Sequence, residues 1–313
     1  MEPGSPVEPM SIVTAPRRRV MTAARREALW GFFFISPWLI GFLLFSIFPI
    51  LSVFYLGFTK YTVLQPPQWI GLDNYIEMFT ADRLYFTSLY NTAYYIALRV
   101  PSWIVVGLFL AILLNRDIRG VTIFRTAFYL PTVIPLVASS VIWLLLLNPQ
   151  VGLLNSALRQ FGIVAPNWLR DPTWAKPAIV ALGVWQLGQT MMIFLAGLQE
   201  IPSQLYEAAE IDGANRIQQF FAVTLPMMTP TIYFNTVTGI IAAFQVFGPA
   251  FIMTGGGPVN STLFNVLYLY RQGFQFLRMG YASAMAVVLF LLVLALTVII
   301  VRTSDKWVRY ERV

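Results

Sequence analysis

The sequence contains neither cysteine nor histidine, and only 11% of its 313 residues are charged. Without cysteine the chain has no disulfide and no thiolate nucleophile. The usual nitrogen and sulfur ligands of zinc and haem are both missing, so neither kind of site is expected. A soluble domain has about 25% charged residues. The shortage of charge therefore indicates that water is not the main solvent around the folded chain.

Two further absences bear on function. The sequence has no GxxxxGK[ST] phosphate-binding loop, so the chain is expected neither to hydrolyse ATP nor to hold a cofactor of its own. All fourteen acidic residues lie outside the long apolar runs, whereas proton- and sodium-coupled carriers commonly place carboxylates or histidines at membrane depth. A secondary carrier is thus the weaker alternative. An enzyme is not expected, because no set of base, nucleophile or metal ligands can be assembled.

Apolar residues are abundant: 58% of the chain is hydrophobic and its mean hydropathy is +0.68. A bilayer core about 30 Å thick needs about 20 apolar residues in a helix. Six runs meet this requirement, at 30–58, 88–114, 123–147, 178–198, 227–254 and 281–301. The first is too long for a signal-peptide core and has no cleavage site after it, so we expect it to be an uncleaved span. The sequence predicts an all-α membrane protein with six transmembrane helices.

Prolines lie within or at the ends of these runs, at Pro37, Pro49, Pro101, Pro131, Pro135, Pro230 and Pro249. Each removes a backbone donor and bends a helix, which a membrane tolerates when neighbouring groups satisfy the freed carbonyl. One interpretation is that these prolines are ordinary residues of bent membrane helices. The alternative interpretation is that bent helices line a cavity that opens and closes.

The orientation follows from the basic residues, since cytoplasmic loops retain more Lys and Arg than outer loops. With the N-terminus inside, thirteen basic residues fall on the inner side and seven on the outer side. Both termini are therefore predicted to be cytoplasmic, as is the loop at about 199–226. The net charge of +7 reflects this bias. Nucleic-acid binding is not expected, because no basic run is interleaved with stacking aromatics.

The loop between the fourth and fifth runs, IPSQLYEAAEIDGANRIQQFFAVTLP, is unusually polar for this chain. Pro202 and Ser203 suit a helix start, and Gly213 suits a helix end because glycine adopts a left-handed conformation without steric cost. A second helix is expected from about Asn215, and Pro226 marks its end or the entry into the fifth run. The predicted helix-turn-helix could lie on the membrane surface. Its acidic side chains favour a protein partner instead, namely Glu207, Glu210 and Asp212.

This loop resembles the coupling loop of ABC importer permeases. The shared pattern is Glu-Ala-Ala, a glycine six residues after the glutamate, and a final Leu-Pro, here Glu207, Ala208, Ala209, Gly213, Leu225 and Pro226. Val223 stands where isoleucine is usual. The resemblance covers nearly the whole chain and narrows toward carbohydrate importers of the maltose type, through SPWLIGFLLFSIFPI, IGLDNYIEMF, FQVFGPAFIMTGGGPVNST and GYASAMAVVLFLLVLALTVI. One departure is Gly248, where many relatives carry an acid.

The resemblance implies a channel-forming subunit of an ATP-driven sugar or oligosaccharide importer in a prokaryotic inner or plasma membrane. Residues 1–29 and 302–313 would be cytoplasmic tails around a six-span permease domain at 30–301. The implied partners are a second homologous permease, two ATPase subunits that hold ATP and magnesium, and an extracytoplasmic substrate-binding protein. Closure of the ATPase subunits would push the loop and exchange inward for outward access.

Amide and aromatic side chains are candidates for contact with a sugar. Gln186, Gln189 and Thr190 have the spacing of one helical face in the fourth run, and Gln245 lies between Phe244 and Phe247 in the fifth. The resemblance places substrate contacts on these two runs. Hydrogen bonds between helices are an equally good interpretation of each amide. Trp185 could stack on a substrate, although an aromatic ring facing lipid or another helix is commoner.

Arg99 is the one charged residue deep within an apolar run, since Arg125 stands only two residues from the start of its run. Snorkelling, or pairing with backbone carbonyls, would explain it. Alternatively its guanidinium faces the pathway and binds hydroxyls or an anionic group. That alternative would suit an importer of glycerol phosphate or another polyol, which is the second hypothesis for the substrate.

Overall fold

The computed structural model describes residues 23–116 and 119–308, which fall into two compact units divided between Ser52 and Val53. The first unit is one helical segment: α1 (Ala23–Phe42) passes through the π-helical turn η1 (Leu43–Ile47) into the start of α2 (Phe48–Leu56), whose last residues belong to the second unit. Pro37 lies inside α1 without ending it. Most of the predicted N-terminal tail, and the end of the predicted C-terminal tail, lie outside the described residues.

After the end of α2, the second unit continues with a small polar layer at one end of its helices. β1 (Thr59–Lys60) pairs antiparallel with β2 (Gln68–Trp69), Thr59 opposite Trp69, and α3 (Asp73–Thr80) follows. The buried amide of Asn74 donates to the carbonyls of Gly57 and Thr59, each at 2.9 Å. This layer leads into α4 (Arg83–Leu114), a single helix of 32 residues that packs against five of the later helices.

The third and fourth predicted spans are bent pairs of helices rather than single helices. α5 (Val121–Val133) and α6 (Leu136–Leu146) meet at 102°, and α8 (Pro172–Trp185) and α9 (Gly188–Gln199) meet at 49°. The first bend has a local cause, because Ile134 precedes Pro135 and is extended, with φ −71° and ψ 126°. The short helix α7 (Leu153–Gln160) lies between the two pairs.

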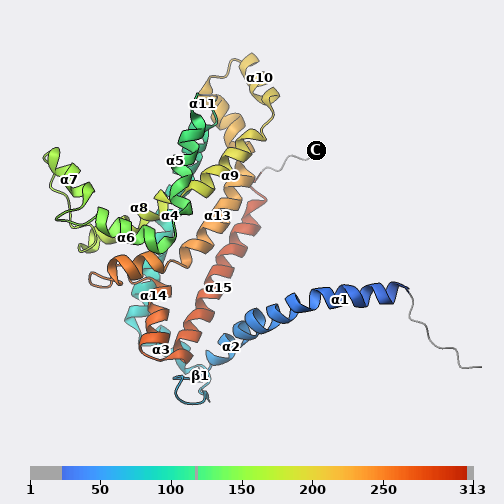
Figure 1. Cartoon of the computed structure of the whole chain (residues 1–313), viewed down its shortest axis with the longest axis vertical. Coiled ribbons are helices and arrows are strands. Elements are labelled where there is room, and N and C mark those ends of the chain that lie inside the picture. The colour runs from blue at the N-terminus through green and yellow to red at the C-terminus, as the bar shows by residue number, and fades with distance from the viewer. Residues whose placement is uncertain (1–22, 117–118, 309–313) are drawn as a thin grey trace, which may run out of the picture. The chain divides into compact units, whose positions relative to one another are not determined.

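The remaining elements return the chain along α4. After α10 (Ser203–Ile211), α11 (Arg216–Gln219), η2 (Phe220–Thr224) and α12 (Leu225–Met227), the chain runs through α13 (Thr229–Phe244), η3 (Ala250–Thr254), α14 (Asn265–Tyr270), η4 (Arg271–Gln275) and α15 (Met279–Ser304). Within this unit, α10 and α11 lie at one end, and α3 and β1 lie at the other (Figure 1).

Length and apolar composition identify three single helices in the described chain that could cross a membrane, Trp30–Leu56, Arg83–Leu114 and Met279–Ser304. The two bent pairs raise this number to five if each pair is one span. The fifth predicted run, 227–254, is instead divided between α13, which has 16 residues, and η3. A mostly helical fold with helices of transmembrane type is confirmed, with the short β1–β2 pair as the exception, and the six spans and the cytoplasmic termini remain predictions.

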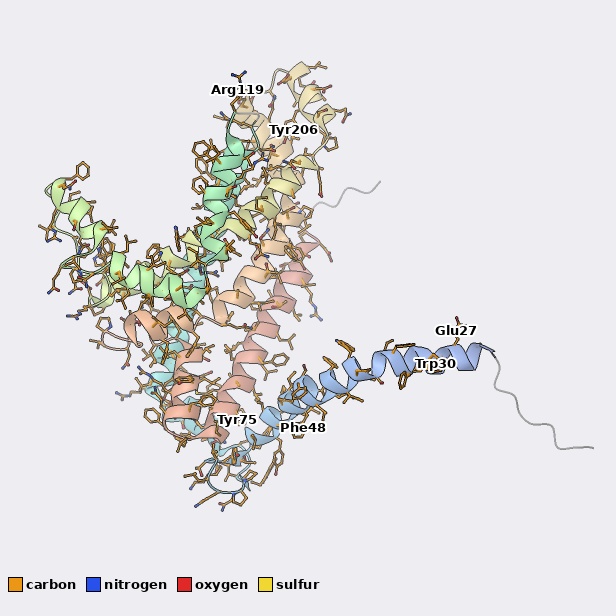
Figure 2. The ribbon with its side chains drawn as sticks, viewed as in Figure 1. Glu27, Trp30, Phe48, Tyr75, Arg119 and Tyr206 are labelled. Atoms are coloured by element: carbon orange, nitrogen blue, oxygen red, sulfur yellow. The ribbon has the colours of Figure 1, made fainter. Side chains whose placement is uncertain are left out.

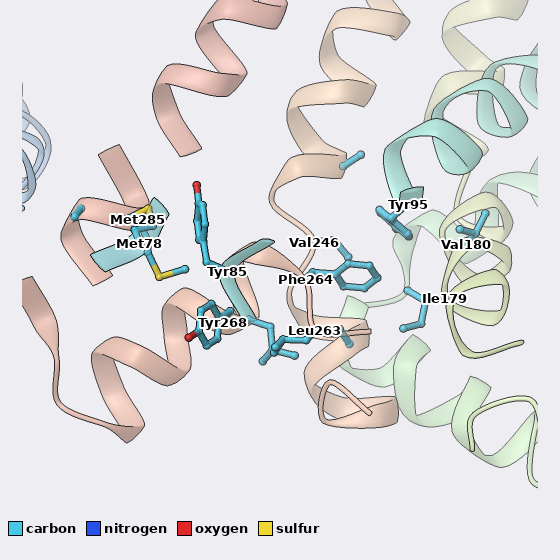
Figure 3. Close-up of a cluster of buried hydrophobic side chains, with 14 of the residues drawn as sticks. Met78, Tyr85, Tyr95, Ile179, Val180, Val246, Leu263, Phe264, Tyr268 and Met285 are labelled. Carbon is cyan, nitrogen blue, oxygen red and sulfur yellow. The ribbon is translucent and has the colours of Figure 1, made fainter. Parts of the chain in front are cut away.

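The largest core cluster lies where α4, α8, α13, α14 and α15 meet. Tyr95 of α4 packs against Phe264 with ring centroids 5.1 Å apart, and Ile179 and Val180 of α8 lie beside them (Figure 3). Toward the polar layer, Met78 and Tyr268 belong to the same cluster. A continuous core therefore holds α4 in place along much of its length.

Candidate functional site

The polar loop folds as the two short helices expected from its sequence. Pro202 precedes α10, and Gly213 follows it in the left-handed region with φ +79°. Asn215 starts α11 with a capping box: its side chain accepts from the amide groups of Ile217 and Gln218, both at 3.0 Å, and its own amide donates to Gln218 Oε1 at 2.7 Å. Local sequence signals are thus enough to fix this turn.

The loop presents a surface that is both acidic and apolar. Ile211 is 87% exposed, Ile217 71% and Phe221 61%, and the carboxylates of Glu207, Glu210 and Asp212 are exposed beside them and form no salt bridge within the described chain. Exposed apolar side chains between charged ones are typical of a protein-docking surface. Ala208 and Gly213 are exposed, while Ala209, Leu225 and Pro226 are half-buried.

A hydrogen bond joins the loop to the helix that follows it. The hydroxyls of Tyr206 in α10 and Thr224 in η2 are 2.9 Å apart. Pro226 does not end the second helix, because η2 and α12 continue it to Met227 and α13 begins at Thr229. The contact of Tyr206 with Thr224 and the nearly unbroken helix after it therefore link α10 to α13.

A cavity of about 420 Å³ lies between α10, η2 and the end of α4. Its lining includes Asn115 and Arg116 at the end of α4, together with Tyr206, Arg216 and Phe220 from the loop. Tyr206 and Arg119 lie at the same end of this unit, and Tyr75 lies at the other (Figure 2).

The predicted helical face of Gln186, Gln189 and Thr190 is wrong. α8 ends at Trp185, and the chain turns at Gln186 before α9 begins at Gly188. As a result Gln189 is exposed, whereas Thr190 is 1% exposed at the packing of α9 on α4. The i, i+3, i+4 rule requires a continuous helix, and the break removes that condition.

Gln186 instead joins the two bent pairs at their bends. Its Nε2 donates to Ser139 Oγ of α6 at 3.0 Å, and its backbone carbonyl accepts from Thr132 Oγ1 of α5 at 3.2 Å. A Cβ at Gly188 would lie 2.7 Å from Tyr129 Cα, so α5 and α9 approach this closely only with glycine. The side-chain amide of Gln186 therefore forms a hydrogen bond between helices, which is one of the two interpretations that its sequence position allows.

In the fifth run, α13 ends before Gln245, whose side chain is exposed. Phe244 is buried, whereas Phe247 is half-buried and joins a row of rings with Phe251 and Tyr270, at centroid distances of 5.3 and 5.1 Å. Gly248 is half-buried near Leu136 of α6. Gln245 and Phe247 therefore lie where the helix breaks, and the row of rings continues into η3 and α14.

Arg99 lies near the middle of α4 and is half-buried. Its guanidinium carbon is 5.0 Å from the centroid of the Trp103 ring and 5.9 Å from that of Tyr95. It forms no hydrogen bond or ion pair with any described residue, and its Nε and Nη1 atoms are buried. The predicted pairing with backbone carbonyls is therefore not found in the described chain.

The carboxylate of Asp82, which joins α4, α14 and α15 through hydrogen bonds, was not identified from the sequence. Asp82 Oδ1 accepts from the amide groups of Leu84 and Tyr85, and its Oδ2 accepts from the hydroxyls of Tyr268 and Tyr281, both at 2.6 Å. An aspartate before a long apolar run is a readable helix-cap signal. Its partners nearly two hundred positions away are not readable from local pattern.

Comparisons with known proteins agree with this architecture. Residues 104–310 match the family model described as "Binding-protein-dependent transport system inner membrane component". The chain is 45% identical to "Probable ABC transporter permease protein YesP" of Bacillus subtilis, over 92% of this chain and 94% of the relative. It is 33% identical to "Sulfoquinovosyl glycerol transport system permease protein SmoG" of Agrobacterium fabrum, over 89% and 92%.

A solved structure has the same fold. It is a bacterial ABC transporter that imports the acidic polysaccharide alginate, and one of its chains superposes with a TM-score of 0.78 at 24% identity, covering 91% of this chain and 98% of that one. Because the family model spans about two thirds of the sequence and both relatives cover most of it, this chain belongs to the binding-protein-dependent inner membrane components of ABC transport systems.

Proposed function

We propose that this chain is the channel-forming subunit of an ATP-driven importer of a sugar or oligosaccharide. The observation that carries the proposal is the helix-turn-helix of α10 and α11, which exposes apolar and acidic side chains that have no partner in the described chain. Such a surface suits docking into a separate protein. Family membership and the relative named for transport of sulfoquinovosyl glycerol, a sugar derivative, support the same assignment.

The importer needs further subunits. A second homologous permease would complete the channel, two ATPase subunits would hold ATP and magnesium, and an extracytoplasmic binding protein would deliver the substrate. The loop would lie in a groove of one ATPase subunit. Glu207 would meet a basic residue there, Ala208 and Ala209 would allow close approach, and Gly213 supplies the turn.

The loop would transmit the movement of the ATPase subunits to the spans. The contact between Tyr206 and Thr224 joins α10 to η2, and Leu225 and Pro226 continue the helix toward α13. A push on α10 would therefore tilt α13. Because the bends of the two broken spans meet at Gln186, a tilt of the helices could change the shape of the pathway there.

The orientation proposed is six spans with both termini cytoplasmic, in a prokaryotic inner or plasma membrane. The fifth span would be α13 together with η3. Arg119 and Tyr206, both from segments predicted to be inside, lie at one end of the second unit, while Tyr75, predicted to be outside, lies at the other (Figure 2). This grouping supports the orientation.

The pathway is proposed to pass the breaks of the fourth and fifth spans. The exposed amides of Gln189 and Gln245 would bind hydroxyl groups, and Phe247 offers an aromatic ring for stacking, whereas Phe244 is buried. Gln186 and Thr190 are better suited to holding the helices together. Arg99 favours glycerol phosphate or another polyol as the alternative substrate.

Reconstitution tests the proposal. Proteoliposomes would contain this chain with its second permease and two ATPase subunits, with ATP enclosed and the binding protein outside. Uptake of radiolabelled saccharides is expected only when ATP and the binding protein are both present. Uptake driven by an imposed proton or sodium gradient without ATP would contradict the proposal and indicate a secondary carrier.

A further inference from the structure

Three aromatic or basic side chains form a stripe along the middle of α4. Tyr95, Arg99 and Trp103 follow one another at intervals of four residues, so they share one face of the helix. The guanidinium lies against both rings, 5.9 Å from the first and 5.0 Å from the second. Contact with aromatic faces favours the cation but provides no hydrogen-bond acceptor.

The stripe contains buried donors without acceptors. Arg99 Nε and Nη1 and Trp103 Nε1 are all buried, and none of them has a hydrogen-bond partner among residues 23–116 and 119–308. The only ion pair described in these ranges joins Arg278 to Glu77. A buried donor without a partner is costly, and a buried charge more so. These three adjacent donors can be satisfied only by an acceptor that is not part of the described chain.

Two glycines on neighbouring helices make room for these side chains. A Cβ at Gly183 of α8 would lie 2.7 Å from Arg99 Nε, and a Cβ at Gly239 of α13 would lie 2.9 Å from Trp103 Cζ3. Both helices belong to spans proposed to line the pathway. The arginine and the indole are therefore packed against the same helices that would move during transport.

We propose that Arg99 and Trp103 form a binding site for an anionic group on the transported saccharide, a carboxylate, phosphate or sulfonate. The guanidinium is permanently charged and presents several donors in one plane, a geometry that matches such oxyanions. The indole N–H adds a donor of fixed direction. A neutral sugar offers only hydroxyls, which leave the charge uncompensated. This inference rests on the proposed importer function and specifies its substrate class.

Equilibrium binding to the assembled importer in detergent, without the binding protein, tests the site directly. The probes are radiolabelled digalacturonate and glycerol 3-phosphate, with galactobiose and glycerol as neutral counterparts. The wild-type complex is expected to bind at least one anionic probe about ten-fold or more tightly than its counterpart. Arg99→Gln should weaken that binding about 10- to 100-fold, as expected for a lost charge-assisted hydrogen bond, and Trp103→Phe should weaken it less.

Matched controls separate recognition from folding. Arg302→Gln removes an exposed arginine from the last turn of α15 and should leave binding unchanged. Arg99→Gln should assemble normally and unfold at no lower temperature than the wild type, because the wild-type guanidinium lacks acceptors. A purely structural arginine would give the opposite result, a lower unfolding temperature with unchanged selectivity, and this would overturn the inference.

The remaining outcomes distinguish the two proposals. If neither anionic probe binds better than its neutral counterpart, or if Arg99→Gln weakens all probes equally, the anion site is wrong. ATP-dependent uptake of a neutral saccharide by the same preparation would then leave the importer function standing. If the wild-type complex shows no ATP-dependent uptake of any saccharide, the proposed function itself fails.

Discussion

At the scale of single residues, the carboxylate of Asp82 is the centre of the polar network near β1 and α3, where it accepts four hydrogen bonds. One oxygen caps the start of α4, and the other binds two tyrosine hydroxyls from α14 and α15. Burial, and next the neighbouring carboxylate, raise the pKa of Tyr268 far above its ordinary value. Its hydroxyl therefore stays protonated and remains a donor at any physiological pH.

We expect Asp82→Ala to destabilise the second unit by about 2–4 kcal/mol, from the lost helix cap and the lost hydrogen bonds to a charged acceptor. The thermal unfolding midpoint of the purified complex would measure this. Tyr268→Phe, which removes one of these bonds, should cost less, and Thr80→Ala at an exposed position of α3 should cost little. Equal midpoints for Asp82→Ala and Thr80→Ala would contradict the role given to this network.

The pathway amides allow a second prediction at this scale. Gln189→Leu and Gln245→Leu should each raise the half-saturating substrate concentration about two- to ten-fold, the equivalent of one lost hydrogen bond. ATP hydrolysis should stay coupled to uptake. Gln275→Leu, at an exposed position in η4, is the control. Uptake curves that coincide with the wild type for both amide variants would remove these residues from the pathway.

At the scale of elements, the sequence predicted what depends on local chemistry. The turn at Gly213, the cap at Asn215 and the bend before Pro135 all follow from residues within a few positions. The break at Gln186 was not predictable, because no proline lies there. It is stabilised by Thr132 and Ser139 from the other bent pair, and such contacts between distant segments leave no periodic signal.

The crossing of the two bent pairs depends on Gly188. A Cβ at this position would lie 2.6 Å from Thr132 Oγ1 and 2.8 Å from the carbonyl oxygen of Phe128. Gly188→Val should therefore separate α5 from α9, cost about 1–3 kcal/mol, and lower both the unfolding midpoint and the uptake rate. Ala196→Val, at an exposed position of the same helix, should be tolerated. A Gly188→Val variant with wild-type stability would show that these helices can repack.

The coupling loop gives a prediction at the same scale. Glu207→Lys should repel a basic partner residue, and Gly213→Val places a β-branched side chain at φ +79°, which costs about 1 kcal/mol or more. Both variants should insert and assemble but hydrolyse ATP with little uptake. The measurement is the ratio of substrate imported to ATP hydrolysed, with Gln204→Lys on the same helix as the control. A wild-type ratio in both variants would show that this loop does not couple the two processes.

At the scale of the whole molecule, composition was sufficient to predict a membrane protein, because 58% hydrophobic and 11% charged residues leave few other solutions. The exact spans were harder. Apolar runs do not show where a helix breaks, so the run at 227–254 appeared as one span, whereas the structure divides it between α13 and η3. The lack of hydrogen-bond acceptors around the buried nitrogens of Arg99 could not be predicted either, since it depends on which helices surround α4.

The last prediction concerns assembly. The chain has an exposed loop suited to a partner and no phosphate-binding loop of its own, so we expect it to be inactive alone. Purified through a tag on this 35.4 kDa chain in mild detergent, it should bring with it a second permease and two ATPase subunits, and native mass spectrometry would determine the stoichiometry. Glu207→Lys should lower the yield of ATPase subunits while the two permeases stay together, because only the loop contact is altered. Recovery of a single chain that imports sugar without ATP would contradict both the proposed assembly and the assignment of ATP hydrolysis to separate subunits.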